Sequence, residues 1–244
     1  MKALVLCAGY GRRLGTLCAD RAKPLLEVGD RAIVEHILGA LARHGICEVH
    51  LNLHHHAQQF RNHLGSGARY GLAISFSYEQ SPLGTAGTLR ALREHFDDGP
   101  LLVHYGDVLT EHDLASLFGV HCERSALATL LVHRRRGSNS YAHVDERGLV
   151  KRFVERPRVA PPFADPEGSW AFSGLCVLSQ AALDELDVMQ AQDLPRDAFP
   201  RWAAAGNLWA QSLAGYRCAV DSPERLKSAR KDFDSGRFGQ WRIA

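Results

Sequence analysis

Short apolar runs alternate with amphipathic segments along the first half of the chain. The runs are aliphatic or β-branched and end in turn residues, which predicts buried strands at residues 3–8, 48–53, 74–78 and 101–105. Between them, apolar positions recur at helical spacing, which predicts helices over residues 32–44, 57–64 and 86–95. Gly45 follows the first of these segments, where the C-terminal cap of a helix would lie.

This alternation of strands and helices predicts a mostly parallel sheet with helices on both faces. Functional loops of such sheets gather at the carboxyl ends of the strands. Gly9, Gly84 and Asp107 each lie just beyond a predicted strand end. We therefore expect these three residues to converge on one crevice.

The pattern changes after Arg124, where strands follow one another with few helices between them. Strands are predicted at residues 126–133, 141–145, 149–155 and 171–178, and a loop rich in proline and acidic residues at 157–168. This half is expected to extend the sheet and to build a lid or a second lobe. The final residues, 235–244, are predicted to form a short exposed tail.

The composition narrows the classes of protein to consider. Of 244 residues, 45% are hydrophobic and 23% are charged, which is ordinary globular usage. The 29 Lys and Arg nearly balance the 27 Asp and Glu, which argues against a protein that coats nucleic acid. No segment approaches the roughly twenty apolar residues of a membrane span. The six cysteines are scattered without a C-x-x-C pair, which fits a reduced compartment, so we expect a cytoplasmic location.

A glycine-rich loop directly follows the first predicted strand. Residues 6–14 read L-C-A-G-Y-G-R-R-L, and K-P-L follows at 23–25. Glycines at this position let backbone N–H groups approach phosphate oxygens, and Arg13 and Lys23 would supply positive charge. Glycine turns after strands are common, so an ordinary turn is the alternative interpretation of this motif taken alone. A nicotinamide site is disfavoured because the second strand ends without an acidic residue, and the pattern G-x-x-x-x-G-K-[ST] is absent.

Two further motifs follow later strands. Residues 79–88 read E-Q-S-P-L-G-T-A-G-T, a sharp turn followed by small residues against which a flat base could lie. The alternative is a plain strand-to-helix connection with Thr85 as the N-terminal cap. Residues 103–107 read V-H-Y-G-D. Asp107 is thus either a Mg²⁺ ligand at a strand tip or an ordinary turn residue.

Taken in order, these motifs resemble those of the sugar-1-phosphate nucleotidylyltransferases. Residues 150–157, V-K-R-F-V-E-R-P, are similar to the family segment F-x-E-K-P. Residues 173–175, S-G-L, are similar to the family segment N-A-G-[IL]. Residues 219–224, A-V-D-S-P-E, are similar to the family segment D-[IV]-G-[ST]-P-E. The resemblance extends from Met1 to about residue 232. It implies a three-layer αβα, Rossmann-like fold with a mostly parallel sheet and a sugar-binding lobe, the nucleotide-diphospho-sugar transferase fold.

The resemblance also implies how the chain is divided. A single domain, 1–234, would consist of a nucleotide-binding half, 1–120, and a sugar-phosphate-binding half, 121–234, with the tail at 235–244.

The reaction implied by the resemblance is the attack of a sugar 1-phosphate on the α-phosphorus of an NTP, with release of pyrophosphate. Arg13 would hold the departing phosphates, Lys23 would contact the reacting centre, and Mg²⁺ on Asp107 would bridge the α-phosphate. The implied nucleotide-binding set is Leu6, Ala8, Gly9, Gly11, Arg12, Gln80, Pro82, Gly84 and Thr85. The implied sugar-phosphate set is Gly106, Ala142, Glu155, Arg156, Ser173 and Gly174.

One departure from the family pattern concerns the metal. Ala219 stands at the family's second metal aspartate, and Asp221 stands where glycine is expected. Either Asp221 reaches the metal from two residues further along, or Mg²⁺ is held by Asp107 and the phosphates of the nucleotide.

Other departures concern the sugar. Arg156 replaces the usual lysine and presents a planar fork of donors. Phe172 stands where asparagine is frequent, and Ala142 where glycine is frequent beside the sugar ring. These differences leave the identity of the sugar open. His54-His55-His56 suggests a metal site, but adjacent side chains diverge, so a strand-end loop near the nucleotide pocket is the preferred interpretation.

These observations favour a Mg²⁺-dependent enzyme that uses GTP with a mannose- or heptose-type 1-phosphate, since P-L-G-T-A-G resembles such members. The near alternative uses UTP with an N-acetylmuramic or other amino-sugar 1-phosphate. A metal-dependent glycosyltransferase is a more distant alternative, but it would be expected to carry a D-x-D motif at the strand end where this chain has only Asp107. A non-catalytic nucleotide-sugar sensor is a further alternative, because Ala219 stands in place of the family's second metal aspartate. The expected partners are the NTP and the sugar phosphate, with no nucleic acid and no membrane; a homo-oligomer is left open.

Overall fold

A computed structural model describes residues 1–96 and 98–238, which group into two compact units. The first unit comprises Met1–Pro82, His104–Leu114 and the described residues from Ala214 onward. The second comprises the described residues of Leu83–Val103 and Ala115–Leu213. The contacts therefore group the chain by interleaved segments and not at a boundary after residue 120. The assignment of residues 1–234 to a single domain stays a prediction.

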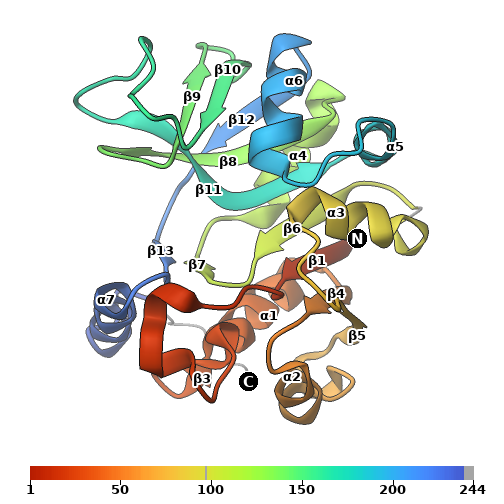
Figure 1. Cartoon of the computed structure of the whole chain (residues 1–244), viewed down its shortest axis with the longest axis vertical. Helices are drawn as coiled ribbons and strands as arrows, with labels where there is room; N and C mark the ends of the chain where they lie inside the picture. The colour runs from red at the N-terminus through yellow and green to blue at the C-terminus, as the bar shows by residue number, and fades with distance from the viewer. Residues whose placement is uncertain (97, 239–244) are drawn as a thin grey trace. The chain divides into compact units, whose positions relative to one another are not determined.

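The first unit is built on three parallel strands, β1 (Lys2–Leu6), β4 (Glu48–Leu53) and β5 (Ala73–Tyr78) (Figure 1). The middle of β1 is aliphatic and fully buried, as expected of a strand in a parallel sheet. Leu6 pairs with Asn52, and Leu53 pairs with Tyr78, so the three strands end at one edge. The predicted α/β class with a parallel sheet is confirmed in this unit.

The other elements of the first unit surround this sheet or extend its loops. They are the 3-10 turns η1 (Arg12–Cys18), η2 (Lys23–Leu25) and η3 (Ala68–Tyr70), the short strands β2 (Glu27–Val28), β3 (Arg31–Ala32), β7 (Val108–Thr110) and β13 (Arg217–Ala219), and the helices α1 (Ile33–Arg43), α2 (Ala57–Leu64) and α7 (Pro223–Asp234). The strand β6 (Leu101–Tyr105) passes from the second unit into the first.

Helix α1 shows why these residues form these elements. Its apolar positions recur at helical spacing and are buried. Glu35 accepts a hydrogen bond from the Ala32 N–H at 2.8 Å, which satisfies one free donor of the first turn. Gly45 follows the last turn with a φ of 72°, a conformation that favours glycine.

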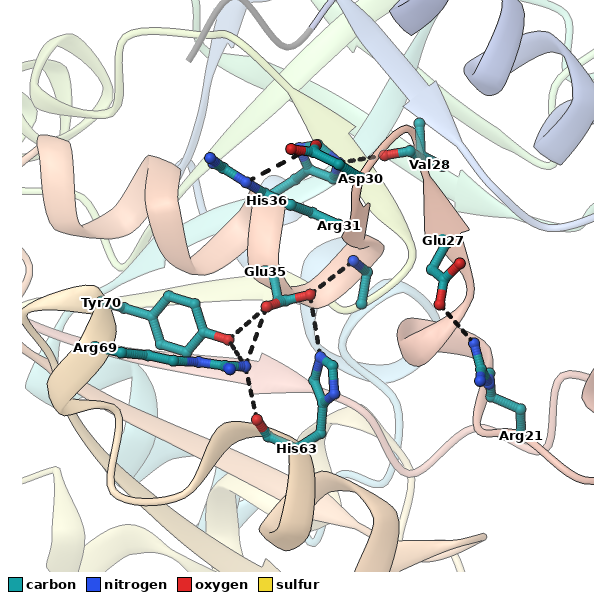
Figure 2. A network of polar contacts seen from close by, with 11 residues as sticks. Arg21, Glu27, Val28, Asp30, Arg31, Glu35, His36, His63, Arg69 and Tyr70 are labelled. Carbon is teal, nitrogen blue, oxygen red and sulfur yellow. Dashed lines mark hydrogen bonds and ion pairs between the residues drawn. The ribbon is translucent and has the colours of Figure 1, made fainter. Parts of the chain in front are cut away.

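Glu35 is also the centre of a polar network that connects α1 to η3 and α2 (Figure 2). Its Oε1 accepts from the Tyr70 hydroxyl at 2.6 Å and from Arg69 at 3.1 Å, and its Oε2 lies 3.0 Å from Nε2 of His63. Burial by itself raises the pKa of the Glu35 carboxyl, but the hydrogen bonds from Tyr70, Ala32 and His63 outweigh it, and the net pKa is lowered. Glu35 is therefore held ionised as a structural acceptor.

The second unit is mainly an antiparallel sheet. Strand β11 (Ser169–Leu178) pairs antiparallel with β8 (Ala128–Arg135) and β9 (Ser140–Val144), and β9 pairs antiparallel with β10 (Val150–Glu155), whereas β12 (Leu208–Ser212) runs parallel to β8. Helical elements of this unit are α3 (Thr85–Ala91), η4 (Arg93–His95), α4 (Leu114–Arg124), α5 (Gln180–Val188), the π-helical turn η5 (Leu194–Ala198) and α6 (Phe199–Ala204). The first residue of α4, Leu114, is the last residue of a first-unit segment.

Sequence patterns missed several elements. Helices α4, α5 and α7 and strand β12 were not predicted, whereas β4, α2 and β6 have the predicted bounds. The predicted exposed tail, 235–244, lies outside the described residues from 239 onward. In its described part, the prediction of exposure is wrong for Phe238, which is only 2% exposed. Its ring stacks on Tyr216 at a centroid distance of 4.7 Å and contacts the ring of His36 at 5.1 Å.

Candidate active site

The glycine loop lies at the carboxyl edge of the parallel strands in the first unit. It follows β1, and η1 begins directly after Gly11. Gly11 has a φ of 66°, and a Cβ at this position would lie 2.9 Å from Cys18 Sγ and 3.2 Å from Lys23 Cβ. Gly11 therefore allows the stem of Lys23 to pack against the loop. A Cβ on Gly9 would meet no atom within 4 Å, so the backbone at Gly9 is accessible to a ligand.

Lys23 and Asp107 form an ion pair beside this loop, between Nζ and Oδ2. Their side chains are 13% and 23% exposed. Gly106 donates its N–H to the Leu6 carbonyl at 3.0 Å, and a Cβ on Gly106 would lie 2.7 Å from that oxygen. Only glycine therefore lets this chain segment approach the end of β1 closely enough to place Asp107 there.

The Cys7 thiol is packed near this ion pair and is not available as a nucleophile. Burial, and to a lesser extent the Asp107 carboxylate, raise the pKa of Cys7 far above its ordinary value. The thiol therefore stays protonated. Its sulfur packs against Gly106, where an added Cβ would lie 2.8 Å from it.

Arg13 is paired with Asp221, which also lies in the first unit. The distance from Arg13 Nη1 to Asp221 Oδ2 is 2.9 Å, and Asp221 Oδ1 lies 3.4 Å from Nε of Arg225. The pairing of β13 with β7 continues to Val220, whose N–H donates to the Asp107 carbonyl at 2.8 Å. Arg13, Lys23, Asp107 and Asp221 are thus brought to one region, although Arg13 and Asp221 are 208 residues apart in the chain.

A chain of buried polar side chains, not predicted from the sequence, lies at the same edge. Asn52 accepts from the Cys7 N–H at 2.9 Å and donates to Glu79 Oε1 at 2.8 Å. Asn52 and Glu79 are only 3% and 6% exposed. The available signal was an asparagine inside the otherwise apolar end of β4 and a glutamate directly after β5.

An aromatic cluster at this edge was also missed. The rings of Tyr10 and His54 meet edge to face at 4.9 Å, and His54 stacks on Tyr78 at 6.4 Å. The Arg12 guanidinium lies 4.7 Å from the centroid of the Tyr10 ring. Tyr10 and Tyr78 are 40% and 61% exposed. Of the predicted nucleotide-binding residues, Leu6, Ala8, Gly9, Gly11, Arg12, Gln80 and Pro82 belong to this unit.

The other two predicted nucleotide-binding residues, Gly84 and Thr85, lie in the second unit. Gly84 has a φ of 80°, and a Cβ there would lie 2.4 Å from the Gln192 carbonyl oxygen. Thr85 accepts from the Leu194 N–H at 2.7 Å. The interpretation of Thr85 as a helix cap is wrong, since α3 begins at Thr85 and Gly84 is its N-terminal cap. The small residues of this motif therefore serve a close approach to residues 192–194.

The predicted sugar-phosphate residues of the second unit differ in accessibility. Glu155 ends β10, with its Oε1 at 3.3 Å from Nε of the exposed Arg156. Burial, and then Asp193, raise the pKa of Glu155, while Arg156 opposes the shift. Arg156 has a φ of 48°, which is uncommon outside glycine.

The remaining predicted residues of this set are buried. Ser173 is 0% exposed and hydrogen-bonded to His133 at 2.9 Å, and Ala142 is 4% exposed. Gly174 is also buried, with a φ of 89°, within the irregular stretch of β11 between Phe172 and Cys176. The Ser173 side chain is thus covered by its neighbours, and the contact of Ser173 with the sugar phosphate stays a prediction. Gly106, the last member of the set, lies in the first unit.

In the part of the chain that the structure describes, no group of three or more His, Cys, Asp and Glu side chains is arranged to hold a metal ion. Asp107 is a hard oxygen donor of the kind that Mg²⁺ uses together with substrate phosphates. Every described helix is too short or too polar to cross a bilayer.

Comparison with known proteins agrees with this geometry. A nucleotidyl transferase family model matches residues 2–215. The chain is 31% identical over 242 residues to a mannose-1-phosphate guanyltransferase of Yarrowia lipolytica, covering 97% of this chain and 63% of the relative. It is 30% identical over 241 residues to the mannose-1-phosphate guanylyltransferase catalytic subunit beta of Dictyostelium discoideum, with the same coverage. The chain thus spans somewhat less than two thirds of these relatives.

A solved structure supports the fold. It is described as a "Putative Glucose-1-Phosphate Thymidylyltransferase" from Bacillus anthracis in complex with sucrose, and it matches with a TM-score of 0.84 over 99% of this chain and 97% of that one. The identity is 17%, so the likeness concerns the fold alone. The predicted α/β fold of the nucleotide-diphospho-sugar transferases is thereby confirmed.

Proposed function

Because this chain belongs to the nucleotidyl transferase family, we propose that it transfers a guanylyl group from GTP to mannose 1-phosphate, giving GDP-mannose and pyrophosphate. The names of the relatives support this choice over the alternative that uses UTP with an amino-sugar phosphate. The observation that carries the proposal is the meeting of the Lys23–Asp107 and Arg13–Asp221 ion pairs beside the glycine loop.

The transfer forms one bond and breaks one. A phosphate oxygen of the sugar 1-phosphate attacks the α-phosphorus, and the bond from that phosphorus to the oxygen bridging to the β-phosphate breaks, so the electron pair leaves with pyrophosphate. Such chemistry needs positioning and charge neutralisation more than covalent help from the protein.

In the proposed mechanism, the first-unit cations neutralise the triphosphate. Arg13 is 62% exposed, and an exposed ion pair is worth little, so its guanidinium can turn from Asp221 to the departing phosphates at small cost. Lys23 is mostly buried beside the loop and is proposed to neutralise charge at the reacting centre. The backbone at Gly9 is proposed to contact the nucleotide with no side chain in the way.

We propose that the divalent cation is Mg²⁺ and that Asp107 would hold it. A bound cation would neutralise charge on the phosphate oxygens. Mg²⁺ is commonly held by one or two carboxylates plus substrate phosphates, so a single aspartate fits. Asp221 fits less well, because both of its oxygens already face arginines.

In the second unit, Glu155 and Arg156 are proposed to bind the sugar phosphate. Arg156 presents a planar fork that matches phosphate oxygens, and its side chain is 58% exposed. The six free cysteines support the proposal that the protein works in the cytoplasm.

Pyrophosphate release tests the function directly. The purified protein is assayed with GTP, UTP, ATP, CTP and dTTP, each with mannose 1-phosphate, a heptose 1-phosphate and N-acetylmuramic acid 1-phosphate. We expect the fastest release with GTP and mannose 1-phosphate. Fastest release with UTP and the amino sugar would establish the alternative substrate pair. No release with any pair, together with thermal stabilisation by nucleotide, would establish a sensor.

A further inference from the structure

Arg225 is a half-buried cation of the first unit to which the proposed mechanism gives no role. It lies in the first turn of α7, and its Nε is 3.4 Å from Oδ1 of Asp221, four residues earlier. The Arg225 N–H donates to Ser222 Oγ at 3.3 Å, and the Arg225 carbonyl accepts from the Cys218 thiol at 3.8 Å. The backbone of Arg225 is therefore fixed to the N-terminal cap of α7 and to β13.

Arg13, the other cation that contacts Asp221, is held less firmly. Its Nη1 donates to Asp221 Oδ2 at 2.9 Å, but it stands on η1, directly after the glycine loop. The Arg13 side chain is 62% exposed, against 34% for Arg225. Water can replace a lost partner at an exposed side chain, so such a contact is broken at small cost. Of these two arginines, Arg13 is therefore the one that can leave Asp221 for a ligand at the loop.

The carboxylate of Asp221 lies close to the groups that would receive the triphosphate. The residue before it, Val220, donates its N–H to the Asp107 carbonyl at 2.8 Å, and Asp107 is paired with Lys23. If Arg13 turned to the departing phosphates and Asp221 had no second cation, an unpaired carboxylate would be left beside a polyanion. Like charges repel at this range, so the departure of Arg13 would oppose the binding that it serves.

We propose that Arg225 is a positioning residue for GTP binding, which keeps Asp221 neutralised when Arg13 turns to the departing phosphates. The inference rests on the proposed function, since it takes Arg13 as the residue that holds these phosphates. Asp221 holds Arg13 near the loop in the free protein, and Arg225 pairs with Asp221 in the bound one. Asp221 stands where the resembled family has glycine, so this exchange of partners belongs to the sequence of this chain.

Two other roles of Arg225 would have different consequences. If its guanidinium contacted the phosphates itself, its removal would weaken binding whether or not residue 221 carries a charge. If Arg225 only stabilised the first turn of α7, its removal would disturb the binding of both substrates alike. The proposed role acts through the charge of Asp221 and concerns the departing phosphates alone, so variants of the two residues distinguish the three cases.

Calorimetry of the Arg225→Gln variant tests the proposal at low ionic strength, where exposed charges are least screened. Dissociation constants for GTP and for inorganic pyrophosphate should each rise about fivefold. The constant for GMP, which lacks both departing phosphates, should stay unchanged. Lys227→Gln is the matched control, since it removes an exposed charge two residues further along α7; its constants should change by less than about twofold. Unchanged affinity of Arg225→Gln for pyrophosphate would overturn the proposal.

Two further variants show whether Arg225 acts through Asp221. The double variant Asp221→Asn/Arg225→Gln should bind pyrophosphate as Asp221→Asn alone does, because residue 221 then has no charge to neutralise. A further fivefold weakening in the double variant, on the scale expected of the single one, would mean direct contact with the phosphates and would overturn the proposal. Arg225→Lys keeps a cation four residues after Asp221 and should retain the affinity of the unaltered protein; a loss as large as that of Arg225→Gln would also overturn it.

Steady-state kinetics separate this inference from the proposed function. Arg225→Gln should raise KM for GTP and leave KM for mannose 1-phosphate unchanged, and an equal rise in both would indicate a structural role and overturn the proposal. Pyrophosphate binding that follows the expected pattern in a protein without any transfer activity would contradict the proposed function and support the role of Arg225. Transfer activity with unchanged pyrophosphate affinity in Arg225→Gln would overturn the role of Arg225 alone.

Discussion

The two units hold their predicted site residues in different ways. In the first unit the functional side chains stand on loops just beyond parallel strands, where Lys23 and Asp107 meet beside the glycine loop. In the second unit the predicted sugar-phosphate residues lie within or directly after antiparallel strands, and Ser173 and Ala142 are buried there. Parallel strands direct all their carboxyl ends to one edge, whereas antiparallel strands alternate in direction, so a motif in them specifies less about where a side chain faces.

The largest expected effect is in the first unit, at Lys23. Lys23→Ala should lower kcat by about 10²- to 10³-fold, the usual cost of removing one charge-stabilising donor from a reacting centre. Lys227→Ala, which alters an exposed lysine on α7 of the same unit, is the matched control. Steady-state kinetics with GTP and mannose 1-phosphate measure both variants. Near-normal turnover of Lys23→Ala would remove the role proposed for it.

Acid pH should destabilise both units, most strongly through His104 in the first unit and His121 in the second. Burial lowers the pKa of His104 in the first unit and of His121 in the second to about 4, from an ordinary 6.5. Because each folded-state pKa is depressed, the stability that these residues contribute is present above pH 6.5 and is lost as the pH falls through 4. The full loss is roughly 3 kcal/mol for each residue.

Urea unfolding at pH 7 and pH 4.5 measures this loss. His104→Asn and His121→Asn should each flatten the pH dependence of the unfolding free energy, while His95→Asn, which alters an exposed histidine of the second unit, should leave it unchanged. Equal slopes for all three variants would contradict the assignment.

The two aspartates of the first unit should differ in their effect on the metal requirement. Asp107→Asn should weaken the apparent Mg²⁺ affinity by about 10- to 100-fold, the range seen when groups that hold or orient a metal are changed. Asp221→Asn should shift it by about threefold or less, because Asp221 holds arginines. Activity titrated against Mg²⁺ after chelator treatment measures both. An equal shift for the two variants would show that Asp221 serves the metal.

In the second unit, a smaller effect than that of Lys23 is expected at Arg156. Arg156→Ala should raise KM for the sugar 1-phosphate about tenfold with a smaller change in kcat, since a charge-assisted bond to the substrate phosphate is lost. Arg158→Ala, two residues along the same exposed segment, is its control. If Arg158→Ala raised this KM equally, a diffuse charge effect would replace the specific contact.

Features of the fold that depend on neighbouring residues could be predicted from the sequence, whereas features that depend on distant contacts could not. The bounds of β4, α2 and β6 follow from apolar runs and flanking turn residues, because these signals lie within a few residues of the element. Helix α4 was missed, since its apolar positions are interrupted by Gly119 and polar residues. The approach of Gly84 to Gln192, 108 residues further along the chain, has no local signal, and the place of Gly84 beside a base stays a prediction.

The sequence by itself determined where the strands of the first unit end and that glycines and cations follow them, because strand pattern and turn chemistry are local properties. Tertiary structure alone decided which groups meet. Lys23 pairs with Asp107 across 84 residues, and Glu79 is linked through Asn52 to the loop after β1. Such pairings depend on strand order and register, which bring distant segments to one edge, and no local pattern encodes them.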